Sequence, residues 1–95
     1  MTIQQFKSQL KPSSDWSPYL KALWYDGQGD WKGAHDIVDS MYGMDAAWVH
    51  AYLHRKEGDH WNANYWYNQA TRTMPKLVLV EEWESLVNHF IVKRG

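Results

Sequence analysis

The chain of 95 residues contains no cysteine and no long apolar run. Without thiols it can have neither a disulfide framework nor a thiolate metal site. Its longest aliphatic block, residues 77–80, is far shorter than the roughly 20 apolar residues that span a bilayer. Residues 1–10 are polar and mixed, unlike the apolar segment of a signal peptide. We therefore expect a cytoplasmic protein that does not associate with a membrane.

Neither sign of charge is in excess, because 10 Lys and Arg stand against 11 Asp and Glu. Binding to nucleic acid or to an anionic membrane needs a basic stripe, so we expect neither partner. Phenylalanine is rare, with two residues, whereas there are seven Trp and six Tyr. These large amphipathic rings suit a thin helical core, and they also suit a surface that contacts a partner. Both interpretations stay open at this point.

A Gly-Asp pair occurs twice, 29 residues apart, at Gly29-Asp30 and at Gly58-Asp59. Ala34 and Ala63 follow the two pairs at the same spacing. A fixed period of this length predicts a repeated helical hairpin. Glycine ends the first helix of each hairpin and aspartate caps the second. The alanine, one turn into the second helix, allows the two backbones to approach closely.

The apolar periodicity predicts an all-α fold in one domain spanning 1–95. We expect an N-terminal arm (1–14) with a short helix over residues 2–10, then two antiparallel helical hairpins (18–46 and 47–75), then a C-terminal capping helix (80–93). A further shift of 29 residues does not continue the apolar pattern into the last helix. This helix is therefore expected to cover the open end of the two repeats.

Local signals place several helix ends. Ser17 followed by Pro18 predicts a helix start, Gly43 is expected to stop the second helix of the first hairpin, and Asp45 is expected to cap the helix that follows. Pro75 is expected to close the second hairpin. The acids at the start of the capping helix favour its N-terminus and are expected to be solvated; they are Glu81, Glu82 and Glu84.

The pattern resembles the tetratricopeptide and Sel1-like helical repeats over about residues 18–75. The residues that carry the resemblance are Leu23 and Trp24, the two Gly-Asp pairs with their alanines, Leu53, the segment 65–67, Ala70 and Pro75. The period of 29 is shorter than the ~34 of a tetratricopeptide. The segment 50–59 is also similar to a group of small bacterial proteins. The repeat resemblance implies a binding or scaffolding surface on the concave side.

His50, His54 and Glu57 stand at i, i+4 and i+7, so they share one face of the third long helix. Two histidines one turn apart are typical Zn²⁺ ligands and a glutamate is a suitable third, with His35 or His60 as further candidates. A metalloprotease motif is excluded because Ala51, not glutamate, follows His50. The alternative is a structural role, with both histidines in the seam between helices and bonded to Tyr or Asp, for which Asp26 and Asp36 are candidates.

Arg55, beside these histidines, suits a carboxylate ligand because its planar fork binds both oxygens. The sequence therefore favours a non-enzymatic module that binds a protein or peptide in a groove on the second repeat, with no cofactor. The expected groove residues are Trp48, His50, Tyr52, His54, Arg55, Glu57, Tyr65 and Trp66. The alternative function is metal binding at His50, His54 and Glu57. A second copy of the chain is an alternative partner, because two repeats are few for a solenoid.

Overall fold

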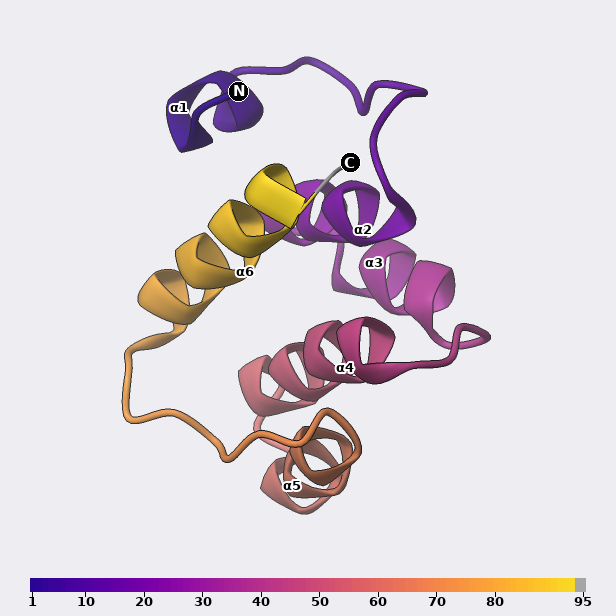
Figure 1. Ribbon diagram of the computed structural model, residues 1–95, viewed down its shortest axis with the longest axis vertical. Helices are drawn as coiled ribbons and strands as arrows, with labels where there is room; N and C mark the ends of the chain where they lie inside the picture. Colours follow the sequence, from indigo (N-terminus) through magenta and orange to yellow (C-terminus); the bar gives the residue numbers. More distant parts are fainter. Residues whose placement is uncertain (94–95) are drawn as a thin grey trace.

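The computed structural model describes residues 1–93, and within that range the chain forms six helices and no strand (Figure 1). The all-α prediction is thus confirmed. The helices are α1 (Ile3–Lys7), α2 (Pro18–Gly27), α3 (Trp31–Val38), α4 (Met44–Lys56), α5 (His60–Gln69) and α6 (Leu79–Lys93). The closest-packed pairs are α2 with α3 and α4 with α5, each joined by a short turn.

The two Gly-Asp turns have the same geometry. Gly29 and Gly58 adopt φ of 87° and 86°, in the left-handed region that favours glycine. Asp30 and Asp59 each accept a hydrogen bond from a backbone N–H in the first turn of the following helix. In both turns the aspartate N–H donates to the carbonyl five residues earlier, at 2.9 Å. Ala34 and Ala63 are fully buried, as close packing of the paired helices requires.

The N-terminal part differs from the expected helix over residues 2–10. Thr2 and Gln5 form a capping box that starts α1, but the helix ends at Lys7. Phe6 is fully buried, whereas Leu10 is 96% exposed and does not share the buried face. The predicted start of α2 is confirmed, with Ser17 as N-cap and Pro18 in the first turn.

Three other helix ends were predicted at the wrong residues. Gly43, with φ of 104°, is the N-cap of α4, and Asp45 lies inside the first turn, where it bonds Lys93 at 2.7 Å. The preceding helix has already ended at Val38. Pro75 does not close α5, which ends at Gln69 and is followed by Thr71 at φ 56°. Thr71 thus has the left-handed conformation that glycine provides in the two earlier turns.

The last helix, α6, packs across α2 and α4 and also contacts α1 (Figure 1). It therefore covers the first helices of both hairpins. Its buried side is formed by Glu82, Trp83, Leu86, Val87 and Phe90, whereas Val80 is 57% exposed. None of the helices in residues 1–93 has both the length and the apolar character to cross a membrane.

Tryptophan side chains fill space between the helices, as a thin helical protein requires. Three indole N–H groups donate to backbone carbonyls of distant elements: Trp24 to Gln9, Trp31 to Leu53 and Trp83 to Leu23. The rings fill space while their single polar atom is satisfied. The structural interpretation of the aromatic content therefore holds for these residues, while Trp61 is 77% exposed.

Candidate functional site

The predicted groove residues do not form one surface, because α4 is buried on two sides. Trp48 and Tyr52 are 8% and 2% exposed, and with the Arg55 side chain, 14% exposed, they lie on the side covered by α6. His50 and His54 lie on the side that faces α3, with Trp66 of α5 stacked on His50. Tyr65 is 48% exposed on α5. An open groove made by all of these side chains is not present.

On the α6 side the carboxylate of Glu82 is 1% exposed, so the expectation that it is solvated is wrong. Arg55 Nη1 donates to its Oε1 at 2.8 Å, and the Tyr67 hydroxyl donates to both of its oxygens at 2.8 and 2.6 Å. Trp48 Nε1 donates to Oε2 at 3.3 Å. Arg55 also bonds the Leu77 carbonyl. The carboxylate that Arg55 was expected to bind in a partner is therefore supplied by the protein itself.

Asp26, at the position of the first repeat that matches Arg55, is also buried and paired. It accepts from the Tyr52 hydroxyl at 3.2 Å and from Lys56 Nζ at 3.0 Å. Burial and the neighbouring Asp26 carboxylate raise the pKa of Tyr52 above its ordinary value, so the phenol stays a neutral donor. Asp36 pairs with Lys32 at 2.8 Å. Neither aspartate bonds the histidines, so the expected partners of His50 and His54 were wrong.

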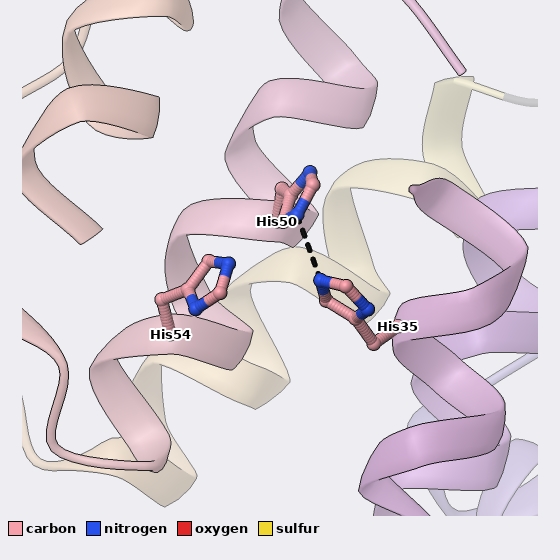
Figure 2. Close-up of side chains that lie close together, drawn as sticks. All are labelled: His35, His50 and His54. Carbon is pink, nitrogen blue, oxygen red and sulfur yellow. Dashed lines mark hydrogen bonds between the residues drawn. The ribbon is translucent and has the colours of Figure 1, made fainter. Parts of the chain in front are cut away.

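On the opposite side three imidazoles meet: His35 from α3, and His50 and His54 from successive turns of α4 (Figure 2). One ligating nitrogen from each ring lies within 4.8 Å of the other two. His35 Nε2 and His50 Nε2 are 3.0 Å apart and share a hydrogen bond. The side chains of His35, His50 and His54 are only 20%, 4% and 13% exposed. The spacing His50 to His54 was visible in the sequence, and folding brings His35 to it.

The environment of the cluster keeps His50 neutral. Burial, and then the neighbouring rings of His35 and His54, lower the pKa of His50 from 6.5 to about 4. A neutral imidazole has a lone pair on one nitrogen, which is the form that binds a metal ion. At physiological pH the most buried ring of the cluster is therefore in the ligating form.

Two indole rings close the cluster. Trp31 stacks on His35 with ring centroids 4.9 Å apart, and Trp66 stacks on His50 at 4.1 Å. The Trp31 N–H donates to the Leu53 carbonyl at 2.7 Å, which holds that ring in place. Trp66 was predicted as a groove residue, and the structure instead makes it a wall of the histidine cluster. Trp31 was not predicted as a site residue, although it stands one turn before His35.

Carboxylates hold and flank the imidazoles. Glu57 Oε1 lies 2.8 Å from His54 Nδ1 and accepts a hydrogen bond from its N–H, so that in the neutral ring Nε2 carries the lone pair. Glu57 thus orients His54 and is not a third ligand on the same footing as the imidazoles. Asp39 Oδ1, which sequence reasoning missed, is 3.9 Å from His35 Nε2 and 4.0 Å from His50 Nε2. The signal for Asp39 was its position one turn after His35.

The remaining metal candidates lie elsewhere. His60 is exposed at the start of α5 and does not join the three imidazoles. A second group of potential ligands, His54, Glu57 and Asp59, also lies within 4.8 Å. In that group Asp59 is already engaged as N-cap of α5, and its hydrogen bonds to Asn62 lower its pKa. The histidine cluster is the better ligand set, because its nitrogens carry no comparable structural duty.

Comparison with known protein families, with curated proteins and with solved structures gives no match to this chain. Its function is therefore inferred from the geometry of its own residues.

Proposed function

We propose that the protein binds a first-row transition metal ion, Zn²⁺ foremost, through His35, His50 and His54. The observation that carries this proposal is the convergence of three ligating nitrogens within 4.8 Å in a region from which most solvent is excluded. Imidazole is a common ligand for Zn²⁺, Cu²⁺ and Ni²⁺, and the absence of cysteine leaves no thiolate donor to compete with it.

The distances are close to those that a tetrahedral ion requires. Two ligands at ~2.0–2.1 Å from Zn²⁺ stand about 3.3 Å apart. The His35–His50 nitrogen pair, at 3.0 Å, is slightly closer than this, and the widest separation in the cluster is up to 4.8 Å. Shifts of about 1 Å in side-chain position, within the reach of ring rotations, bring the three nitrogens to the required spacing.

Asp39 supplies the natural fourth ligand, because its carboxylate already lies near two of the three nitrogens. Three imidazoles and one carboxylate would fill a tetrahedral shell, and a shell without an open position is typical of a structural rather than a catalytic zinc site. We therefore propose a non-catalytic metal centre. Since His35 belongs to α3 and the other two histidines to α4, the ion would hold the first helical pair against the second.

The test uses protein purified without a polyhistidine tag. Co²⁺ titration should give the intense visible absorption of a tetrahedral site at one ion per chain, and Zn²⁺ should displace it. Zn²⁺ at 100 times its Kd should add about 2.7 kcal/mol to the free energy of unfolding. His35→Ala should abolish both effects, whereas His60→Ala, the exposed control, should retain them. Absence of stoichiometric binding to the wild type, or equal loss in the two variants, would refute the proposal.

Binding of a protein or peptide remains a second proposal, now based on a different surface. Trp61 and Tyr65 stand one turn apart on α5 and are 77% and 48% exposed. Exposed aromatic pairs are enriched at contact hot spots. If a second copy of the chain covers them, light scattering should show a dimer that Trp61→Ser dissociates. A wild-type monomer at high concentration would exclude that partner.

A further inference from the structure

A small cavity of about 210 Å³ opens on the side of α4 away from the histidines, between the loop that follows α5 and the start of α6. Its lining includes Trp48, Arg72, Thr73, Glu82 and Ser85. Arg72 and Thr73 also line a neighbouring polar depression with Asn68 and Thr71. The cavity thus has an aromatic wall, one guanidinium in its lining, and two hydroxyl groups, those of Thr73 and Ser85, besides the Tyr67 hydroxyl that is bonded to Glu82.

Arg72 packs against Trp48 without using its side-chain hydrogen-bond donors. Its Cζ lies 3.5 Å from the centroid of the Trp48 ring, so the guanidinium stacks on the indole face. Its backbone N–H donates to the Tyr67 carbonyl at 2.9 Å and pins the loop. Within residues 1–93 its side chain makes no hydrogen bond and no ion pair with the protein. Stacking occupies the face of the guanidinium and leaves the N–H groups at its edge free.

The charge balance of the cavity favours an anion. Glu82 is its acidic lining residue, but both oxygens of that carboxylate already accept hydrogen bonds, including one from Arg55. Two guanidinium groups therefore stand against one carboxylate, a local surplus of one positive charge. A surplus of one matches a monoanion better than a doubly charged phosphate, which Glu82 would also repel.

We propose that this cavity binds the carboxylate of a small organic acid, with the Arg72 fork as its anchor and the hydroxyls of Thr73 and Ser85 as further donors. A planar carboxylate accepts two parallel N–H bonds from a guanidinium, whereas a neutral amide offers a single acceptor oxygen; a phosphate can also accept two, but its second negative charge counts against it beside Glu82. The volume is below the ~300 Å³ at which drug-sized sites begin, so the ligand is small or inserts only its acid end. The proposed anchor is Arg72, whose guanidinium has no carboxylate partner among the described residues, and not Arg55, which is paired with Glu82.

The test follows the indole N–H signal of Trp48 by NMR at constant ionic strength, with acetate, its neutral analogue acetamide and inorganic phosphate as probes. Acetate should give a saturable shift, acetamide none, and phosphate a weaker one. Arg72→Ala should lower the acetate affinity about tenfold or more, because a charge-assisted hydrogen bond is lost. Arg72→Lys should also weaken binding, since it keeps the charge but not the fork.

The matched control is Lys76→Ala, which removes one positive charge from the same loop outside the cavity lining. It should leave the acetate affinity unchanged within about twofold. Equal losses in Arg72→Ala and Lys76→Ala would show diffuse attraction and overturn the site. Binding of phosphate without acetate, or no saturation by acetate at all, would overturn the carboxylate assignment. The metal titration of the same variants should be unaffected, so this proposal and the metal centre fail separately.

Discussion

The two buried polar sides of α4 use their side chains in opposite ways. Beneath α6, the charges of Arg55 and Glu82 are paired with each other and the remaining oxygen positions are taken by Tyr67 and Trp48. Beside α3, three imidazoles crowd together with a single hydrogen bond between two of them. That bond needs one protonated Nε2, whereas a metal ion would use the lone pairs of both rings. Full pairing indicates a role in folding, whereas a hydrogen bond between two imidazole nitrogens can be exchanged for bonds to a metal ion.

The contrast between the two sides of α4 is tested most strongly by Glu82→Gln, which keeps the shape of the side chain and removes its charge. Arg55, 14% exposed, then has a buried positive charge without its partner. Breaking a buried pair in this way costs about 3–5 kcal/mol. We expect a loss of that size in the free energy of unfolding, measured by urea denaturation, with no change in Zn²⁺ affinity under conditions where the variant is folded.

The control is Glu81→Gln, a neighbouring exposed acid, which should change stability by less than about 0.5 kcal/mol. The double variant Arg55→Met with Glu82→Leu should recover most of the loss, because an apolar pair of similar volume often replaces a buried ion pair without penalty. If Glu82→Gln were as stable as Glu81→Gln, the α6 side would not be the folding element that the contacts indicate.

The sequence was sufficient to predict those parts of the structure that contacts between neighbouring residues determine. Gly58 and Asp59 act within one turn of themselves, through a left-handed φ and a cap to the next N–H groups. The end of α5 was predicted at Pro75 but lies at Gln69, because Thr71 adopts the left-handed conformation without a glycine to signal it. A β-branched residue rarely takes that conformation, so no local rule predicts it.

Long-range contacts decide the parts that were missed. Glu82 stands between two other acids, and only the packing of α6 on α4 distinguishes it from Glu81. Similarly, the sequence offered His35 and His60 as further ligand candidates. The packing of α3 on α4 brings His35, and not His60, to the other two histidines. Helical periodicity shows which residues share a face of one helix. It does not show which face of another helix lies opposite.

The histidine side should make the free energy of unfolding depend on pH between about 4 and 6.5. The pKa of His50 is about 4 in the folded protein against 6.5 for the free side chain, so between these values the unfolded chain binds more protons. Stability should therefore be fully present above about pH 6.5 and fall by up to about 3 kcal/mol as the pH drops to about 4. Denaturation at pH 7, 6 and 5 without metal measures this slope above the titration range of most carboxylates.

His50→Gln should remove most of that slope, while His60→Gln, which changes an exposed ring, should keep it. A slope that persists unchanged in His50→Gln would place the titrating group elsewhere. Such a result would weaken the comparison, because the neutral state of His50 is part of what makes the cluster competent to bind.

Of the test variants, as distinct from the controls, Glu57→Gln should change stability least. It distinguishes a residue that orients a metal ligand from one that supports the fold. The Glu57 side chain is 37% exposed and its contact with His54 lies near the surface, so the loss of stability should be below about 1 kcal/mol. Yet the carboxylate fixes which nitrogen of His54 carries the proton, and loss of such a partner typically lowers metal affinity about 10–100-fold. Competition titration with a Zn²⁺ chelator measures the affinity, and Asp36→Asn, which breaks the exposed pair with Lys32, is the control.

Glu57→Gln and Glu82→Gln make the same chemical change on the two sides of one helix. If the comparison holds, the first weakens metal binding with little loss of stability, and the second destabilises the fold without altering metal affinity. Similar effects of both variants on both measurements would mean that the two sides are one coupled network. The side chains that join them through α4 are small or apolar, Ala51 and Leu53 among them, and supply no chain of hydrogen bonds across the helix. We therefore expect the two effects to separate.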